Sequence, residues 1–99
     1  MGYAISIVPE AIEELRELPM NVRRRIATAI DRDLAHEPTT LSRNRKPLPG
    51  LSPSFAHVPP VWELRVGDYR VFYDIEAEER AVFVRAVRFK GQSTTEEIT

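Results

Sequence analysis

The chain of 99 residues contains no cysteine and two histidines, and its 14 basic and 15 acidic side chains give a formal net charge of −1. The absence of cysteine excludes disulfides and thiolate metal sites, and two histidines are too few for a typical zinc centre, so we expect no metal site. A net charge this close to zero does not by itself predict a nucleic-acid-binding protein. The length predicts a single domain over residues 1–99, built around one core.

No segment has the composition of a membrane span or of a secretory signal. The longest uncharged stretch, residues 47–61, is interrupted by five prolines and a glycine. Residues 1–20 carry acids where a signal peptide would have a basic segment followed by an apolar one. We therefore expect a cytoplasmic protein that neither associates with a membrane nor binds a small-molecule cofactor.

The first third of the chain predicts a short strand followed by two helices. Residues 3–8 alternate apolar and small side chains, as a strand does. Pro9 suits the first turn of a helix in which Ile12, Leu15 and Leu18 form an apolar stripe. A second proline ends this helix, and the short connection to the next one predicts an antiparallel helical hairpin. The apolar stripe of the second helix consists of Val22, Ile26, Ala29, Ile30 and Leu34.

Residues 38–60 have the composition of a loop. Six of the eight prolines lie here, together with the basic residues Arg43, Arg45 and Lys46. A loop of this length is uncommon in a small domain unless it has a function. A solvated connection between the helices and the sheet is the alternative, and the composition does not separate the two.

The last part of the chain predicts a meander of three strands. These strands are residues 61–66, 69–75 and 81–89. Gly67-Asp68 between the first two suits a two-residue hairpin turn, and the spacing from Ser93 to Glu96 is typical of a capping box for one final helical turn. The order β-α-α-β-β-β predicts an α+β fold, in which a small antiparallel sheet of about four strands packs on the N-terminal helical hairpin through its convex face.

The hairpin turn predicts two faces of different chemistry. It places Val66 opposite Tyr69 and Arg65 opposite Arg70. Arg65 and Arg70 then share the face away from the helices, where like charges cost about 0.2–1 kcal/mol. Such a pair either binds an anion or is screened by an acid, and Glu63 on the same face is more simply an ion-pair partner than a general base. The face predicted to lie under the helices consists of Trp62, Leu64, Val66, Tyr69, Val71, Tyr73 and Ile75.

Further cations extend the predicted arginine-lined face. Either Arg85 or Arg88 joins it, depending on the length of the turn before the last strand. Arg43, Arg45 and Lys46 precede the hairpin and could form its rim. Phosphoryl transfer depends mainly on positioning and on charge stabilisation, so a face of this kind would suffice for RNA cleavage without a catalytic triad.

Four segments resemble a known family. Trp62–Ile75 is similar to the central hairpin of the RelE/ParE superfamily of bacterial toxins from toxin–antitoxin pairs. Arg45–Gly50 resembles the basic segment that precedes this hairpin, Pro9–Arg16 the first helix, and Val87–Gly91 the last strand. The resemblance covers nearly the whole chain, in the same order of elements.

The resemblance implies a toxin that a cognate antitoxin holds inactive in a hetero-oligomer. RelE-type members cut mRNA on the ribosome, where a ribose 2′-hydroxyl attacks its own phosphate. Arg70 aligns with the arginine that contacts the scissile phosphate, and we expect it to do so through two nitrogens. Lys90 and Arg65 are the further catalytic cations that the resemblance implies. The implied RNA-binding residues are Lys46, Arg43, Arg45, Arg88 and Tyr73.

Two departures from the RelE pattern leave other functions open. RelE has lysines where Val61 and Glu63 stand, and a tyrosine or histidine near the C-terminus where this chain has residues 93–96, Ser-Thr-Thr-Glu. The sequence therefore predicts no group for proton transfer. The alternatives to an mRNA endonuclease are a ParE-like inhibitor of DNA gyrase and an inactive member that only binds protein.

Overall fold

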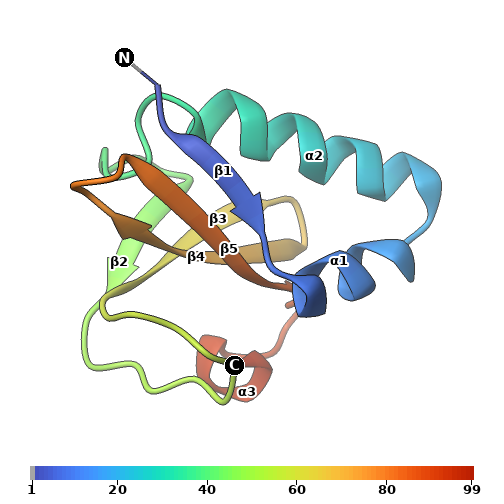
Figure 1. The fold of residues 1–99 in the computed structure, drawn as a ribbon. Helices are drawn as coiled ribbons and strands as arrows, with labels where there is room; N and C mark the ends of the chain where they lie inside the picture. The colour runs from blue at the N-terminus through green and yellow to red at the C-terminus, as the bar shows by residue number, and fades with distance from the viewer. Residues whose placement is uncertain (1) are drawn as a thin grey trace.

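The computed structural model describes residues 2–99 and contains a five-stranded sheet between α2 on one side and α3 on the other (Figure 1). The elements are β1 (Ala4–Ile7), α1 (Pro9–Arg16), α2 (Met20–Leu34), β2 (Arg45–Leu48), β3 (Val61–Val66), β4 (Tyr69–Glu76), β5 (Ala81–Phe89) and α3 (Thr95–Ile98). The strand order is β1-β5-β4-β3-β2, which agrees with the predicted α+β fold. No helix among the described residues is long and apolar enough to cross a membrane.

The sheet differs from the prediction in two ways. It has a fifth strand, β2, inside the segment predicted to be a loop. Pro47 interrupts the strand pattern there, and the sheet tolerates it because β2 is an edge strand. The sheet is also mixed, since β1 pairs with β5 in parallel while the other pairs are antiparallel. Parallel neighbours require a long connection, and the helices and the meander between β1 and β5 supply it.

The predicted register of the β3–β4 hairpin is confirmed. Val66 pairs with Tyr69 and Arg65 with Arg70 across the two-residue turn. Gly67 in this turn has a φ of 58°, a conformation that glycine adopts without strain. The face predicted to lie under the helices does so, and its buried members in the main core are Trp62, Leu64, Val66, Val71 and Tyr73.

The helices supply the other half of the main core. The buried stripe of α2 is as predicted, with Ile26, Ala29, Ile30 and Leu34 inside. In α1 the stripe is rotated relative to the prediction, because Ala11 and Leu15 are buried while Ile12 is 37% exposed.

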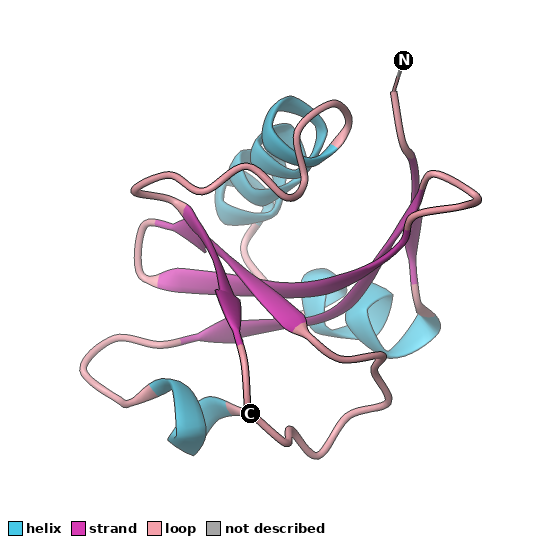
Figure 2. Cartoon of the chain, turned by 90° about the vertical axis from the view of Figure 1, so that its left-hand side faces the viewer, coloured by secondary structure: helices cyan, strands magenta, loops and turns pink. Residues whose placement is uncertain are grey.

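The opposite face of the sheet carries a second, smaller core. Val61, Phe72 and Ala86 are buried there, and Phe55 from the loop and Ile98 from α3 pack against them. The loop after β2 and α3 therefore cover part of the face that lies away from α2 (Figure 2).

The final helix begins one residue later than predicted. Thr94 is its N-cap, and the Thr94 side chain and the Glu97 carboxylate satisfy each other's backbone N–H groups. The capping box is therefore formed by Thr94 and Glu97. The predicted pair, Ser93 and Glu96, has the same spacing but lies one residue earlier in the chain.

Asp74 holds the loop against this second core. It is 1% exposed and accepts hydrogen bonds from Arg85 Nε at 2.9 Å, from Arg85 Nη2 at 3.1 Å and from the Val58 N–H at 2.8 Å. A bulge in β5, where the register shifts between Phe72 and Tyr73, brings Arg85 to this position. The buried carboxylate thus links two strands to the loop.

We expect Asp74→Asn to lower the free energy of unfolding by about 3 kcal/mol, because it leaves the half-buried Arg85 without its charged partner. Urea unfolding measures this change, and faster amide hydrogen exchange in residues 49–60 would report the loosened loop. Glu76→Gln is the matched control, since Glu76 lies exposed on the same strand. A stability within about 0.5 kcal/mol of wild type would contradict the prediction.

Candidate functional site

Three arginines form a row across the sheet face that lies away from α2, and we call them the arginine row. Arg65 of β3 is the Cα partner of Arg70 of β4, which in turn is the partner of Arg88 of β5. The sequence left open whether Arg85 or Arg88 joins this face. Both do, because the bulge in β5 adds one residue between the Arg70–Arg88 pair and the Asp74–Phe83 pair.

Arg70 is buried, which the sequence did not predict. It is 7% exposed, and its Nε lies 3.1 Å from Oε1 of Glu63, which is itself 4% exposed. Its Nη1 donates to the carbonyl oxygens of Gly67 at 2.9 Å and Tyr69 at 2.8 Å. Glu63 therefore screens the arginine pair, and Nη2 is the one guanidinium nitrogen of Arg70 left for an external anion among the contacts of residues 2–99. The expected two-nitrogen contact with a phosphate does not fit this geometry.

The Glu63–Arg70 pair is incompletely satisfied. The Nε–H of Arg70 faces Glu63 at 3.1 Å without the alignment of a hydrogen bond, and Oε2 of Glu63 has no hydrogen-bond partner within the described chain. A buried pair of this kind contributes little net stability, but breaking it is costly because one charge stays behind.

The accessible cations lie beside this pair. Arg43, Lys46 and Arg65 are exposed, and none has an ion pair or side-chain hydrogen bond to another part of the described chain. With Asn44 and Glu63 they line a pocket of about 220 Å³. Lys46 is the cross-strand partner of Glu63, so the pocket lies directly next to the arginine row. An anion can reach Arg65 and Lys46 more easily than Arg70.

Arg88 in β5 and Lys90 just after this strand differ in whether other residues of the chain already bind their side chains. Arg88 is engaged, because its Nε donates to Glu14 at 2.6 Å and its Nη1 to the carbonyl oxygen of Ile98 at 2.8 Å. The backbone N–H of Lys90 donates to the Asp68 carbonyl at 2.7 Å, which places Lys90 beside the β3–β4 turn. Lys90 therefore lies at the end of the sheet where the arginine row is found.

Two expected RNA contacts lie on the other face of the sheet. The Arg45 side chain points toward α2, where its Nη1 donates to the carbonyl oxygen of Asp33 at 2.8 Å. Only 13% of this side chain is exposed to solvent. Tyr73 is fully buried in the main core and donates its hydroxyl to the carbonyl oxygen of Pro38. Burial raises the pKa of Tyr73 far above the usual value for a phenol, so the hydroxyl stays protonated. The structure contradicts both as RNA contacts, because strand alternation turns them inward.

The buried Tyr73 phenol should make the stability of the fold depend on pH in the alkaline range. Because its pKa is raised in the fold, its stabilisation is complete below the unfolded pKa of about 10 and is lost as the pH rises above that value. We expect Tyr73→Phe to cost about 1–3 kcal/mol at pH 8 through the lost hydrogen bond. We also expect a smaller loss of stability for this variant than for wild type between pH 8 and alkaline pH. Urea unfolding at both pH values tests this, with Tyr69→Phe as the control; parallel pH profiles of wild type and Tyr73→Phe would contradict it.

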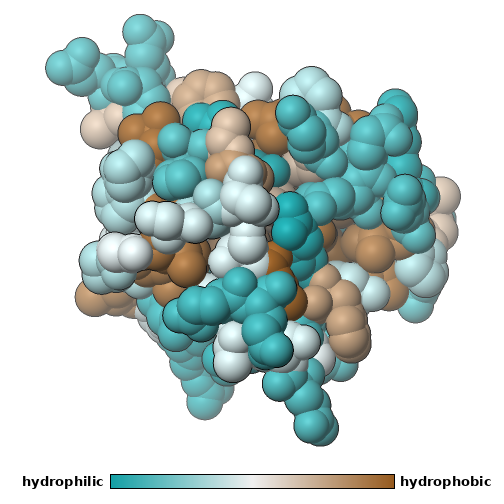
Figure 3. Space-filling model, turned by 90° about the horizontal axis from the view of Figure 1, so that it is seen from below, coloured by the Kyte–Doolittle hydropathy of each residue, from teal (hydrophilic) through white to brown (hydrophobic). Residues whose placement is uncertain are grey.

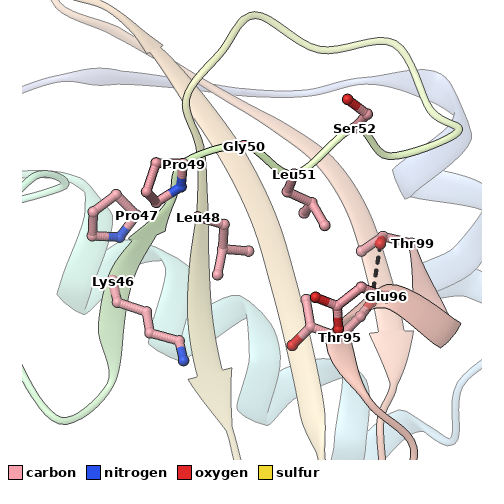
Figure 4. Close-up of a pocket in the computed structure, with 10 residues that line it drawn as sticks. All are labelled: Lys46, Pro47, Leu48, Pro49, Gly50, Leu51, Ser52, Thr95, Glu96 and Thr99. Carbon is pink, nitrogen blue, oxygen red and sulfur yellow. Dashed lines mark hydrogen bonds between the residues drawn. The ribbon is translucent and has the colours of Figure 1, made fainter.

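A cavity of about 660 Å³ lies between β2, the following loop and α3 (Figure 4). Lys46 and Leu48 line it on the strand side, and Thr95, Glu96 and Thr99 line it on the helix side. Seen from below, the surface is mostly hydrophilic, with apolar side chains visible between the polar ones (Figure 3). Lys46 lines both this cavity and the smaller cationic pocket, so the two lie next to each other.

Asn44 is the site residue that sequence reasoning missed. It lines the cationic pocket, and its carbonyl oxygen accepts the Arg65 N–H at 2.7 Å. A lone asparagine in a proline-rich segment carries no signal of its own. The pairing of β2 with β3 is what brings it next to Arg65.

Comparison with known proteins identifies the family. A family model for the ParE toxin of the type II toxin–antitoxin system parDE matches residues 5–92. No curated protein sequence matches the chain.

Solved structures share the fold. An archaeal RelE–RelB complex from Pyrococcus horikoshii aligns with a TM-score of 0.73 at 23% identity, covering 94% of this chain and 100% of that one. The toxin–antitoxin complex RelBE2 from Mycobacterium tuberculosis aligns with a TM-score of 0.71 at 26% identity, covering 90% and 99%. A mutant of the E. coli toxin RelE in the free state aligns with a TM-score of 0.57 at 22% identity, covering 91% and 85%.

The family match includes four strands and all but the first residue of β1, together with the cations of the candidate site, and it agrees with the resemblance drawn from the hairpin sequence. The chain therefore belongs to the ParE toxin family, within the RelE/ParE superfamily, and is a toxin of a type II toxin–antitoxin system.

Proposed function

We propose that this toxin is a ribosome-dependent mRNA endonuclease that inhibits translation. The observation that carries the proposal is the pocket formed by Arg43, Lys46 and Arg65, three exposed cations without internal partners, beside the arginine row. A site of this kind neutralises phosphates, and the similarity in fold to RelE toxins supports the same conclusion.

The chemistry needs little more than charge and position. The nucleophile is the 2′-hydroxyl of the RNA itself, and negative charge grows on the oxygens of the attacked phosphate. Arg65 and Lys46 line the pocket and can contact these oxygens there. Arg70 lies deeper in the same sheet face, and its Nη2 is the nitrogen that can donate to the phosphate. Preorganised donors of this kind stabilise the transition state because the protein has already oriented them.

Glu63 positions Arg70 in this scheme. The Glu63 carboxylate lies against Nε of Arg70, and the carbonyl oxygens of Gly67 and Tyr69 accept from Nη1. These contacts fix the orientation of the guanidinium and therefore the direction in which Nη2 points. Glu63 also lines the pocket, but it is only 4% exposed, so we assign it to positioning Arg70 and not to the RNA. The proton of the 2′-hydroxyl must therefore pass to a group outside the pair, such as solvent or a ribosomal group.

Induced expression of the chain alone tests the proposal, with growth, transcript integrity and plasmid supercoiling followed in the same culture. We expect growth arrest together with cleaved transcripts, and cleavage of purified mRNA only when ribosomes are present. The family model that matches is that of ParE, which favours inhibition of DNA gyrase as a second candidate. Arrest with relaxed plasmid and intact mRNA would support gyrase, whereas normal growth would contradict both.

We also propose a cognate antitoxin as the partner, in a toxin–antitoxin hetero-oligomer. The two similar structures from Pyrococcus horikoshii and Mycobacterium tuberculosis are both complexes of a toxin with an antitoxin. The unpartnered cations of the pocket suit a segment that carries acids. Co-expression with the neighbouring small gene should yield a complex that fails to cleave mRNA, and a neighbouring product that does not bind this chain would contradict the assignment.

A further inference from the structure

A second cationic groove lies around the edge of the sheet from the candidate site. Its volume is about 310 Å³, and it runs between α2 and the β3–β4 turn. Arg25 and Arg32 line it from α2, one turn on either side of Ala29, whose small side chain leaves the space open. The lining residues are Arg25, Ala29, Arg32, Asn44, Arg65, Val66 and Gly67.

The arginines of this groove differ in whether an acid neutralises them. Arg25 is exposed and has no ion pair or side-chain hydrogen bond within the described residues. Its guanidinium rests against the turn, where a Cβ on Gly67 would lie 2.8 Å from Nη1 and from Nη2. Arg32 is paired with Asp33 through Nε and Nη2, at 3.1 and 2.9 Å, but its side chain stays 63% exposed. No acid lines the groove.

The groove lies next to the candidate site. Arg65 and Asn44 line both this groove and the pocket that contains Arg43 and Lys46. The Arg65 N–H donates to the Asn44 carbonyl oxygen at 2.7 Å, just beyond the last β2–β3 pair at Leu64, and this contact holds the two shared residues side by side. Arg65 thus belongs both to the arginine row and to the groove that Arg25 and Arg32 line from α2.

We propose that the groove binds the phosphate backbone of the RNA strand on one side of the cleaved bond. The inference builds on the proposed function, because it assigns the path of that substrate. Arginine forks suit phosphate oxygens, and the Asn44 amide can add a further contact. An acidic protein segment fits less well, because the apolar lining residues Ala29 and Val66 are only 3% and 6% exposed and offer almost no surface to bury.

The salt dependence of RNA binding tests the inference. The probe is a short, fluorescently labelled 2′-O-methyl RNA, which cannot be cleaved by its own 2′-hydroxyl, and anisotropy gives Kd at several salt concentrations. Each phosphate contact with a single strand contributes about 0.7 to the slope of log K against log salt. We expect Arg25→Gln/Arg32→Gln to reduce the magnitude of the slope by about 1.4, which corresponds to two lost contacts.

Two further variants serve as controls. Arg16→Gln/Arg24→Gln removes the same charge from exposed positions outside the groove and should leave the slope unchanged. Arg25→Lys/Arg32→Lys keeps the charge and should retain most of the slope. Melting temperatures close to wild type would show that all three double variants fold.

The outcomes separate the inference from the proposed function. An unchanged slope for Arg25→Gln/Arg32→Gln, or an equal loss in the Arg16/Arg24 control, would overturn the inference while leaving cleavage at the arginine row intact. Weaker binding of a polyglutamate peptide with unchanged RNA binding would also overturn it and assign the groove to an acidic protein. A reduced slope in a protein whose wild type cuts no mRNA would keep the groove and contradict the endonuclease.

Discussion

Arg70→Ala is expected to destabilise this toxin by about 3–5 kcal/mol, because it leaves the carboxylate of Glu63 buried without its partner. Urea unfolding at neutral pH measures this loss. Arg65→Ala is the matched control, since Arg65 is the cross-strand partner of Arg70 but is exposed and has no acidic partner in the described structure. Its stability should stay within about 0.5 kcal/mol of wild type. An Arg70→Ala variant as stable as wild type would show that the Glu63–Arg70 pair is not needed for the stability of the fold.

The instability of Arg70→Ala would obscure its effect on activity, so a second variant is needed. Glu63→Leu/Arg70→Met removes both charges and fills similar volume, and we expect it to recover most of the lost stability. If Nη2 of Arg70 contacts the scissile phosphate, this folded double variant should still cleave mRNA about 10²–10³ times more slowly than wild type. Ribosome-dependent cleavage by the double variant at the wild-type rate would remove Arg70 from the catalytic site and leave it a structural residue.

Loss of Arg65 is expected to abolish toxicity without affecting the fold. Arg65 is exposed, lines the cationic pocket and has no internal ion pair in the described chain, so its guanidinium is available to the RNA. We expect Arg65→Ala to slow cleavage about 10²–10³-fold, as the loss of one preorganised donor does. Arg65→Lys should restore part of the rate, since lysine keeps the charge but loses the fork.

Lys46→Ala and Arg24→Ala complete this experiment. Lys46→Ala should weaken binding in a salt-dependent way with a smaller effect on the cleavage step, because a lysine acts on phosphate as a point charge. Arg24→Ala is the control, an exposed arginine on α2 that lines none of the pockets described. Melting temperatures and cleavage rates on the same preparations distinguish a catalytic from a structural loss. Wild-type cleavage by Arg65→Ala would show that the exposed cations do not carry the chemistry.

The structure changes the order of the candidate residues. The sequence pointed to Arg70 first, with Lys90 and Arg65 as further catalytic cations and Lys46 as an RNA-binding residue. In the fold Arg70 is largely engaged by Glu63 and two carbonyl oxygens, while Arg65 and Lys46 face the pocket. In the proposed site, Arg70 therefore has a fixed position behind the exposed cations.

The sequence by itself determined the hairpin, its register and the core face. Strand alternation has a period of two, and a glycine in a two-residue turn sets which residues face each other, so Arg65 and Arg70 were paired correctly from local information alone. The α2 stripe was equally local, because a helix repeats its buried face every three to four residues.

Only the tertiary structure decided which of the cations are available. Strand β2 was hidden by Pro47, and its pairing with β3 is what turns Arg45 toward the helices and Lys46 toward the pocket. Strand alternation placed Glu63 on the face of the arginine pair, but which of the two arginines it contacts depends on side-chain conformations across neighbouring strands. The groove between α2 and the β3–β4 turn joins Arg25 and Arg32, which share one face of α2, to Arg65 of β3, and no local pattern in the sequence links the helix to the strand. A binding surface formed by separate elements exists only once the chain has packed, because packing alone sets the distances between its charges.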